Sequence, residues 1–146
     1  MGAPYFLQVI ESKPMETGNV TVNADAIAKG LAAEGKMAFY GLYFDTAKAD
    51  IKPASEPQLK EMAKLLSAQK ALKVYIVGHT DSQGSLDANM QLSQKRAEAV
   101  VTALVKDYKI DAKRLSARGA ASLAPLSSNS SEAGRARNRR VELVEQ

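Results

Sequence analysis

The feature that most constrains the fold is a short strand-like run that is followed, after a loop bounded by glycines, by one long amphipathic helix. The run KVYIV, residues 73–77, has four apolar or aromatic residues in five, which is typical of a strand covered on both faces. The helix is predicted from about Asp87 to Tyr108. Its apolar residues recur 3, 4, 7, 8 and 11 positions after the first, as one buried helix face requires: Ala97, Val100, Val101, Leu104, Val105 and Tyr108. A strand followed by such a helix favours a sheet with the helix packed on it.

A further strand and helix are predicted before this unit. The aromatic-rich run of residues 37–45 predicts a strand, and a helix is predicted from Ser55 to about Gln69. Ser55 and Gln58 have the spacing of a capping box, with Pro57 in the first turn, where its missing N–H is tolerated. One apolar stripe of this helix is predicted to face the core: Leu59, Met62, Ala63, Leu65 and Leu66.

The chain after the long helix is predicted to add two more strands. Residues 114–119, RLSARG, form the first, and residues 139–145, RRVELVE, alternate polar and apolar side chains as a strand does. Residues 122–138 between them are predicted to be a polar loop with one helical turn. The order from residue 37 is strand, helix, strand, helix, strand, strand. It predicts an α+β sandwich of helices on a mixed sheet, because a strand–helix–strand crossover makes its two strands parallel.

The first 36 residues are predicted to form a β-β-α extension to a domain of residues 37–146. Residues 4–12 and 18–25 alternate enough to be strands, and a short helix is predicted to follow with Asp25 as its N-cap. The first residues, MGAPYFLQV, lack the basic stretch and apolar core of a signal peptide, so a trimmed mature start is expected.

The composition excludes several kinds of site and concentrates the net charge in one segment. The 146 residues include no cysteine, which excludes disulfides and thiolate metal sites, and no apolar run approaches the roughly 20 residues that span a bilayer. Residues 1–111 hold 13 basic and 13 acidic side chains, whereas residues 112–146 hold seven basic and three acidic ones. The net charge of +4 therefore arises in the last 35 residues, where six of the seven basic side chains are arginine.

The C-terminal arginines make nucleic-acid binding the alternative function. Four of them lie within residues 135–140, and a basic cluster is one mark of a nucleic-acid-binding surface. However, no aromatic residue follows Tyr108, so no base-stacking platform accompanies the cluster. Arg139 and Arg140 are neighbours beside a predicted strand and should point to opposite faces, which would split the cluster. No nucleic acid is therefore expected as a partner.

The loop GHTDSQG, residues 78–84, holds the only histidine of the chain and an acid between two glycines. A catalytic dyad of His79 and Asp81 lacks a positioned nucleophile, and a metal site lacks further ligands because the chain has no cysteine and no second histidine. Asp81 and Arg96 together suit a ligand that carries an ammonium and a carboxylate on one carbon. An ion pair between these two side chains is the structural alternative. No catalytic residue, metal or cofactor is expected.

Two ordered motifs resemble those of the OmpA C-terminal-like domain, which is shared by Pal lipoproteins and the periplasmic part of flagellar stator proteins. They are GHTDSQGSLDANMQLSQKRAEAV, from Gly78, and PLSSNSSEAGRARNRRVEL, from Pro125, and the resemblance extends from about Phe39 to Glu145. It implies helices on a mixed sheet and non-catalytic binding of peptidoglycan through the meso-diaminopimelate residue of the stem peptide. It also implies a periplasmic location, where such a domain anchors an outer-membrane protein or lipoprotein to the cell wall.

The resemblance assigns site residues position by position. Asp81 resembles the acid that takes the ammonium of the ligand, and Arg96 resembles the arginine that takes its carboxylate. The other matched positions are predicted to line or close the pocket: Phe44, Asp45, Asn89, Leu92 and Arg139. Three further matches are predicted to be scaffold: Thr80, Asn138 and Arg140. The chain departs from the pattern at Ala121, where the family often has the second glycine of G-x-G.

Overall fold

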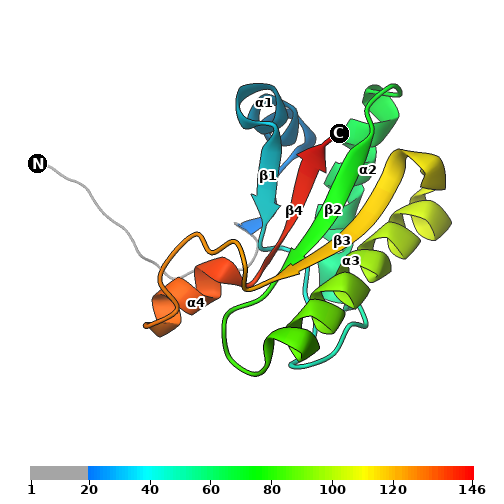
Figure 1. Cartoon of the computed structure of the whole chain (residues 1–146). Coiled ribbons are helices and arrows are strands. Elements are labelled where there is room, and N and C mark those ends of the chain that lie inside the picture. The colour runs from blue at the N-terminus through cyan, green and yellow to red at the C-terminus, as the bar shows by residue number, and fades with distance from the viewer. Residues whose placement is uncertain (1–19) are drawn as a thin grey trace, which may run out of the picture.

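A four-stranded mixed sheet carries helices on one face in the computed structural model, which describes residues 20–146 (Figure 1). The sheet order is β1-β4-β2-β3, and the strands are β1 (Lys36–Phe39), β2 (Val74–His79), β3 (Leu115–Ala121) and β4 (Arg140–Glu145). β2 and β3 are parallel, whereas β4 is antiparallel to both of its neighbours. The last strand therefore lies inside the sheet, and its first residues lie beside the end of β2.

The described residues form four α-helices: α1 (Ala24–Glu34), α2 (Glu56–Ala68), α3 (Leu86–Tyr108) and α4 (Glu132–Asn138). α2 and α3 pack against each other, α3 also packs on β2 and β3, and α4 lies at the end of the sheet where β4 begins (Figure 1). The core contains large side chains that are at most 2% exposed, among them Phe39, Met62, Ile76, Leu104 and Leu143. The predicted α+β class and the mixed sheet are confirmed.

The predicted N-terminal strands are corrected where the structure describes them. The first, residues 4–12, lies outside the described residues, and residues 20–23 form no strand. The backbone of Val22 pairs instead with one side chain of α2. Its N–H donates to Gln58 Oε1 at 2.8 Å, and its carbonyl accepts from Gln58 Nε2 at 2.9 Å. This amide replaces the strand partner that the sequence pattern predicted.

The predicted cap of α1 is wrong, and the predicted capping box of α2 does not form although Ser55 stands at the N-cap position. α1 is capped by Asn23, whose Oδ1 accepts a first-turn N–H at 2.9 Å, and not by Asp25. Ser55 ends the 3₁₀ turn η2 (Pro53–Ser55) and stands at the N-cap position of α2, but its hydroxyl makes no capping bond; its Oγ accepts instead from the N–H of Tyr43 at 2.7 Å. Ser55 and Gln58 are both fully buried. The start of α2 is thereby tied to two loops.

The aromatic run of residues 37–45 forms a strand only as far as Phe39. The backbone then leaves the sheet because the polar groups of Tyr43 find other partners. The Ser55 hydroxyl takes its N–H, and the N–H of Lys52 donates to its carbonyl at 2.9 Å. The remaining residues of the run form a loop that lines the functional cavity.

The helices α1 and α4 add detail that the sequence did not predict. Ile27 and Leu31 of α1 are buried in the same core as the rest of the chain. The domain boundary between residues 36 and 37 stays a prediction. α4 has seven residues, more than the single turn predicted for this loop. Its length brings Arg139, the residue that follows it, toward the end of β2. A second 3₁₀ turn, η3 (Ala112–Arg114), leads into β3.

Two glycines bring α3 into direct backbone contact with β2 and β3. A Cβ atom on Gly78 would lie 2.3 Å from the carbonyl oxygen of Ser93, and one on Gly119 would lie 2.5 Å from the backbone nitrogen of Gln94. Both distances are shorter than non-bonded contacts allow, so only glycine fits. The hydroxyl of Ser93 also accepts from the N–H of Ala121 at 3.1 Å. These contacts fix the position of α3 on the sheet.

Ala121 accommodates the departure from the G-x-G pattern by adopting left-handed backbone, with φ of 49°. It lies where the register between β2 and β3 shifts. Its carbonyl accepts from the N–H of Thr80 at 2.9 Å, which holds the backbone directly before Asp81. The alanine therefore takes the strained conformation that glycine adopts freely, and the loop keeps its anchor.

Replacing Gly78 by alanine is expected to destabilise the fold by about 1–3 kcal/mol, because the new methyl group meets backbone atoms of α3. Urea unfolding followed by circular dichroism measures the change. Gly30→Ala is the matched control, since the close contact of its Cβ would be with the movable end of the Met37 side chain and its nearest backbone contact, Lys36 O at 3.7 Å, is an ordinary one. An equal effect of both substitutions would contradict the close contact.

Candidate functional site

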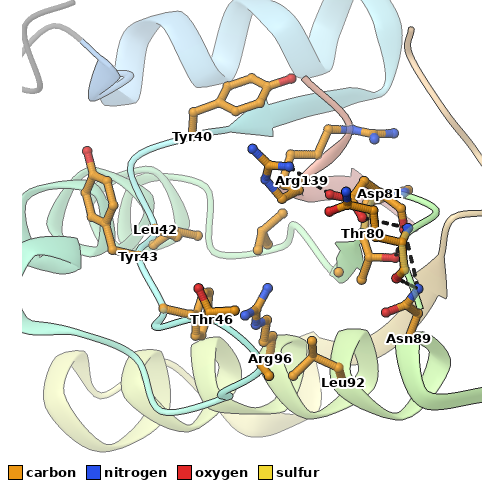
Figure 2. Close-up of a pocket in the computed structure, with 17 residues that line it drawn as sticks. Tyr40, Leu42, Tyr43, Thr46, Thr80, Asp81, Asn89, Leu92, Arg96 and Arg139 are labelled. Atoms are coloured by element: carbon orange, nitrogen blue, oxygen red, sulfur yellow. Dashed lines mark hydrogen bonds and ion pairs between the residues drawn. The ribbon is translucent and has the colours of Figure 1, made fainter. Parts of the chain in front are cut away.

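A cavity of about 590 Å³ lies where the end of β2, the loop after β1, the first half of α3 and the start of β4 meet (Figure 2). Six of the seven predicted site residues line it: Phe44, Asp81, Asn89, Leu92, Arg96 and Arg139. Asn89, Leu92 and Arg96 recur every three or four residues and so share one face of α3. Segments that are far apart in the sequence therefore converge on one concave surface.

Asp81 lies on one wall of the cavity, held in a tight turn after β2. Its side chain is only 9% exposed. One carboxylate oxygen accepts from the N–H of Gln83 at 2.9 Å, and the other accepts from Arg139 Nη1 at 2.7 Å. The side chain of Asn89 donates to the carbonyl of Gln83 at 2.9 Å, and the Thr80 hydroxyl donates to the carbonyl of Asp81 at 2.7 Å. Asn89 and Thr80 thus hold the loop that positions the acid.

Arg96 lies on the opposite side of the cavity from Asp81, on α3 (Figure 2). Its Nε donates to the carbonyl of Lys48 at 2.8 Å, and its Nη2 donates to the carbonyl of Asp45 at 3.1 Å. The guanidinium carbon lies 5.0 Å from the centre of the Phe44 ring, which favours the cation. Burial lowers the pKa of Arg96, but an arginine so placed remains charged at neutral pH.

The alternative of an ion pair between Asp81 and Arg96 is wrong. Asp81 pairs with Arg139, and among residues 20–146 the hydrogen bonds of Arg96 go to backbone carbonyls rather than to a carboxylate. The two charges therefore face each other across the cavity without neutralising each other.

Asp45 is placed differently from the prediction, because its carboxylate does not line the cavity. The side chain is 65% exposed and pairs with Lys52 Nζ at 2.9 Å. Asp45 contributes its backbone carbonyl to Arg96 instead. Phe44 stacks on the same arginine. The Phe-Asp pair therefore orients the cation.

Arg139 closes one side of the cavity and is shared between two acids. Its Nη1 lies 2.7 Å from Asp81 Oδ2, and its Nη2 lies 2.6 Å from Glu132 Oε2. The hydrogen bonds with Glu132 and Asp81 raise the pKa of Arg139. Sequence reasoning missed Glu132, which lies at an unspecified position of the second motif.

The loop after β1 supplies lining residues that sequence reasoning also missed. Tyr40, Leu42, Tyr43 and Thr46 of this loop line the cavity (Figure 2). The signal was Gly41, since a glycine inside a strand pattern often marks its interruption. The Tyr40 hydroxyl donates to the carbonyl of Arg137 at 2.8 Å, which ties this loop to α4.

The C-terminal arginines do not form one basic face. Arg140 is buried, with Nε donating to Glu142 at 2.7 Å, whereas Arg139 is 40% exposed and pairs with Asp81 and Glu132. Arg135 donates to the carbonyl of Asn129 at 2.9 Å, and Arg137 donates to the Ser127 hydroxyl at 2.8 Å. These side chains brace α4 and the loop before it.

Two of the predicted scaffold residues have contacts that fit this role. Asn138 is fully buried, and its amide oxygen accepts the N–H groups of Leu126 and Ser127 at 2.7 and 3.1 Å. Arg140 donates to the carbonyls of Asn138 and Ala124 at 3.1 and 2.9 Å. Together they fix the turn from α4 into β4, and therefore the position of Arg139.

His79 lines the cavity from the end of β2 and belongs to a buried polar cluster. Its side chain is 5% exposed, and its Nε2 lies 3.6 Å from Glu142 Oε1, slightly longer than a hydrogen bond. The imidazole of His79 lowers the pKa of Glu142 to about 2, helped by Arg140 and against the effect of burial. Glu142 is therefore a carboxylate at neutral pH that neutralises the buried Arg140.

The depressed pKa of Glu142 predicts a pH-dependent stability. A carboxyl whose pKa falls from 4.5 to about 2 on folding stabilises the protein above pH 4.5 by about 3 kcal/mol, and this contribution disappears as the pH falls toward 2. Glu142→Gln should therefore lower the free energy of unfolding at pH 7, and the difference from wild type should shrink between pH 5 and pH 2. Urea unfolding across this range measures it; a difference independent of pH would contradict the assignment.

The described residues offer no metal centre and no membrane-spanning helix. No group of three or more histidine, cysteine or acidic side chains within residues 20–146 is arranged to hold a metal ion. None of the helices in this part of the chain is long and apolar enough to cross a bilayer.

Comparison with known proteins identifies the family to which the chain belongs. The model of the OmpA family matches residues 43–139, which contain the end of the β1 loop, Asp81, Arg96 and Arg139. The chain belongs to the OmpA family. Its predicted membership is therefore confirmed.

Relatives of this OmpA-family chain include outer-membrane proteins and lipoproteins. It is 38% identical over 133 residues to outer membrane protein Omp38 of Acinetobacter baumannii, covering 91% of this chain and 36% of that protein. It is 35% identical over 148 residues to the probable lipoprotein YiaD of Escherichia coli, covering 98% of this chain and 64% of that protein. The chain thus spans less than two thirds of these relatives.

Among solved structures, the peptidoglycan-associated lipoprotein of Burkholderia pseudomallei is similar, with a TM-score of 0.65 and 30% identity. The match covers 78% of this chain and 92% of that one. The fold of the OmpA-family domain is therefore shared with a lipoprotein whose name states an association with peptidoglycan.

Proposed function

We propose that this chain binds peptidoglycan without catalysis, through the free amino-acid end of the meso-diaminopimelate residue in the stem peptide. The observation that carries the proposal is the pair of opposed charges, Asp81 and Arg96, on two sides of one cavity. The free end of the ligand carries an ammonium and a carboxylate on one carbon, so each of the two opposed side chains can bind one of these groups. Asp81 takes the ammonium, and Arg96 takes the carboxylate as a fork-shaped donor.

The surroundings of both charges support this assignment. The turn bonded by Asn89 and Thr80 fixes Asp81, and two carbonyls with the Phe44 ring fix Arg96. Such pre-organised groups lose little conformational entropy when a ligand binds. Leu92, between Asn89 and Arg96 on α3, offers an apolar surface to the methylene chain of the ligand.

The proposed biological role is to anchor an outer-membrane protein or lipoprotein to the cell wall from the periplasm. Each hydrogen bond to a charged group contributes roughly 1.5–3 kcal/mol, so a site with two or three gives modest affinity. The wall is a dense array of identical stem peptides, and attachment to a membrane raises the effective concentration of the site. Modest affinity therefore suffices for retention. The names of Omp38, YiaD and the Burkholderia lipoprotein support this role.

Removing either charge is expected to weaken binding. Asp81→Asn keeps the shape of the side chain and Arg96→Lys keeps a cation, and each should lower the affinity for sacculi about tenfold or more, because a charge-assisted or bidentate contact is lost. Co-sedimentation with purified diaminopimelate-type sacculi measures this. Arg118→Gln, an exposed arginine of β3 outside the cavity, is the control and should pellet as wild type does. Folded Asp81 and Arg96 variants that pellet equally well would overturn the proposed site.

The chemistry of the stem peptide provides a second test. Sacculi in which lysine replaces diaminopimelate keep the ammonium but lack the adjoining carboxylate, so Arg96 loses its partner. Wild-type protein should bind them about tenfold or more weakly in the same assay. Equal binding to both kinds of sacculi, or binding to glycan strands without stem peptides, would point to the sugar backbone as the ligand.

A further inference from the structure

Four side chains at the rim form a continuous chain of alternating charge that ends at Asp81. Arg135 Nε lies 3.2 Å from Glu132 Oε1, Glu132 Oε2 lies 2.6 Å from Arg139 Nη2, and Arg139 Nη1 lies 2.7 Å from Asp81 Oδ2. The order is Arg135, Glu132, Arg139, Asp81. Glu132 is the first residue of α4, its side chain is 65% exposed, and it does not line the cavity.

The acid that is proposed to bind the ammonium is therefore already paired with a cation. A guanidinium at 2.7 Å from Asp81 opposes the approach of a second positive charge. The other carboxylate oxygen of Asp81 already accepts the N–H of Gln83. The affinity of this subsite for an ammonium consequently depends on how firmly Arg139 holds Asp81.

Glu132 limits that hold by engaging the other amino group of the same guanidinium. Carboxylates and arginines form their strongest pairs when two parallel N–H donors meet both oxygens. Because Nη2 of Arg139 is directed to Glu132, only Nη1 is bonded to Asp81. The hydrogen bonds of Arg139 and Arg135 also lower the pKa of Glu132, so it stays negatively charged.

The charge of Glu132 adds to this geometric effect. For an ammonium bound at Asp81, the nearest charge is the negative Asp81 itself. With increasing distance follow the positive Arg139, the negative Glu132 and the positive Arg135. Without Glu132, the cluster would hold two guanidinium groups and a single carboxylate, so one positive charge would be left uncompensated. The remaining field would then oppose the ammonium, although solvent and salt screen the exposed part of the cluster.

We propose that Glu132 is a positioning residue that keeps Asp81 available to the ammonium of the ligand, by holding Arg139 away from a bidentate pair with Asp81. This inference rests on the proposed function of the cavity. On binding, the ammonium takes up acceptor positions at Asp81, and Arg139 remains bonded to Glu132 at the edge of the site. Arg139 thereby gives up its place as the main partner of Asp81 and lines the edge of the site, where its bond to Glu132 holds it.

Titration of free meso-diaminopimelate into the full chain by calorimetry or NMR tests this role. Glu132→Gln should raise the Kd roughly two- to fivefold, the range expected for a partly screened charge. Glu132→Asp keeps the negative charge at the start of α4 and should bind more tightly than Glu132→Gln. The control is Glu34→Gln, the same substitution at an exposed residue of α1, which should bind as wild type does.

A double-mutant cycle separates an effect through Arg139 from a general effect of surface charge. In an Arg139→Gln background, Glu132→Gln should change the Kd less than it does in the wild-type protein. An equal change in both backgrounds, or an unchanged Kd on Glu132→Gln while the wild type binds, would overturn the role of Glu132 and leave the proposed function intact. Failure of the wild type to bind meso-diaminopimelate would overturn the proposed function and this inference together.

Discussion

The direct contact between α3 and the ends of β2 and β3 is the constraint on which the site depends. Gly78 and Gly119 let the helix backbone at Ser93 touch the sheet, and any side chain at these glycines would push it away. Leu92 lies on the helix directly before this contact, and Arg96 lies within one turn after it. Asp81 follows β2 directly. One packing contact therefore sets the separation of the two charges that face each other across the cavity.

The second determinant is the central place of β4 in the sheet. Because β4 pairs with both β1 and β2, the residue that precedes it is brought to the end of β2, where Asp81 lies. Arg139 reaches the acid for this reason, while Arg140, the next residue, is buried against Glu142. The positive charge of the C-terminal segment is therefore divided between an internal brace and the rim of the site.

The sequence predicted the elements with strong periodicity and missed the features that depend on tertiary partners. The stripe of α3 and the run before Gly78 predicted a helix and a strand correctly, since each pattern reflects one buried face. The capping box at Ser55 failed because its hydroxyl binds a loop backbone twelve residues earlier in the chain. No local pattern can reveal such a partner. The strand predicted for residues 37–45 was too long for the same reason, since the backbone of Tyr43 bonds to partners outside the sheet.

The candidate site shows the same division. The first motif placed Asp81 and Arg96 at one cavity because the spacing within a strand–helix unit is nearly fixed, whereas Arg139 reaches it only through the pairing of β4 with β2. The motif did not reveal that Asp45 acts through its carbonyl, since a backbone role leaves no mark on the residue type. Glu132 was invisible because its importance lies in a contact with Arg139, and not in a position of the pattern.

The central claim is that one zwitterion bridges Asp81 and Arg96, and a crystal structure with bound meso-diaminopimelate tests it most directly. The account predicts the ammonium at hydrogen-bond distance from the Asp81 carboxylate and both oxygens of the adjoining carboxylate on the Arg96 guanidinium. A ligand whose carboxylate lies on Arg139 or on the outer arginines of α4, with Arg96 still bonded only to backbone carbonyls, would contradict it.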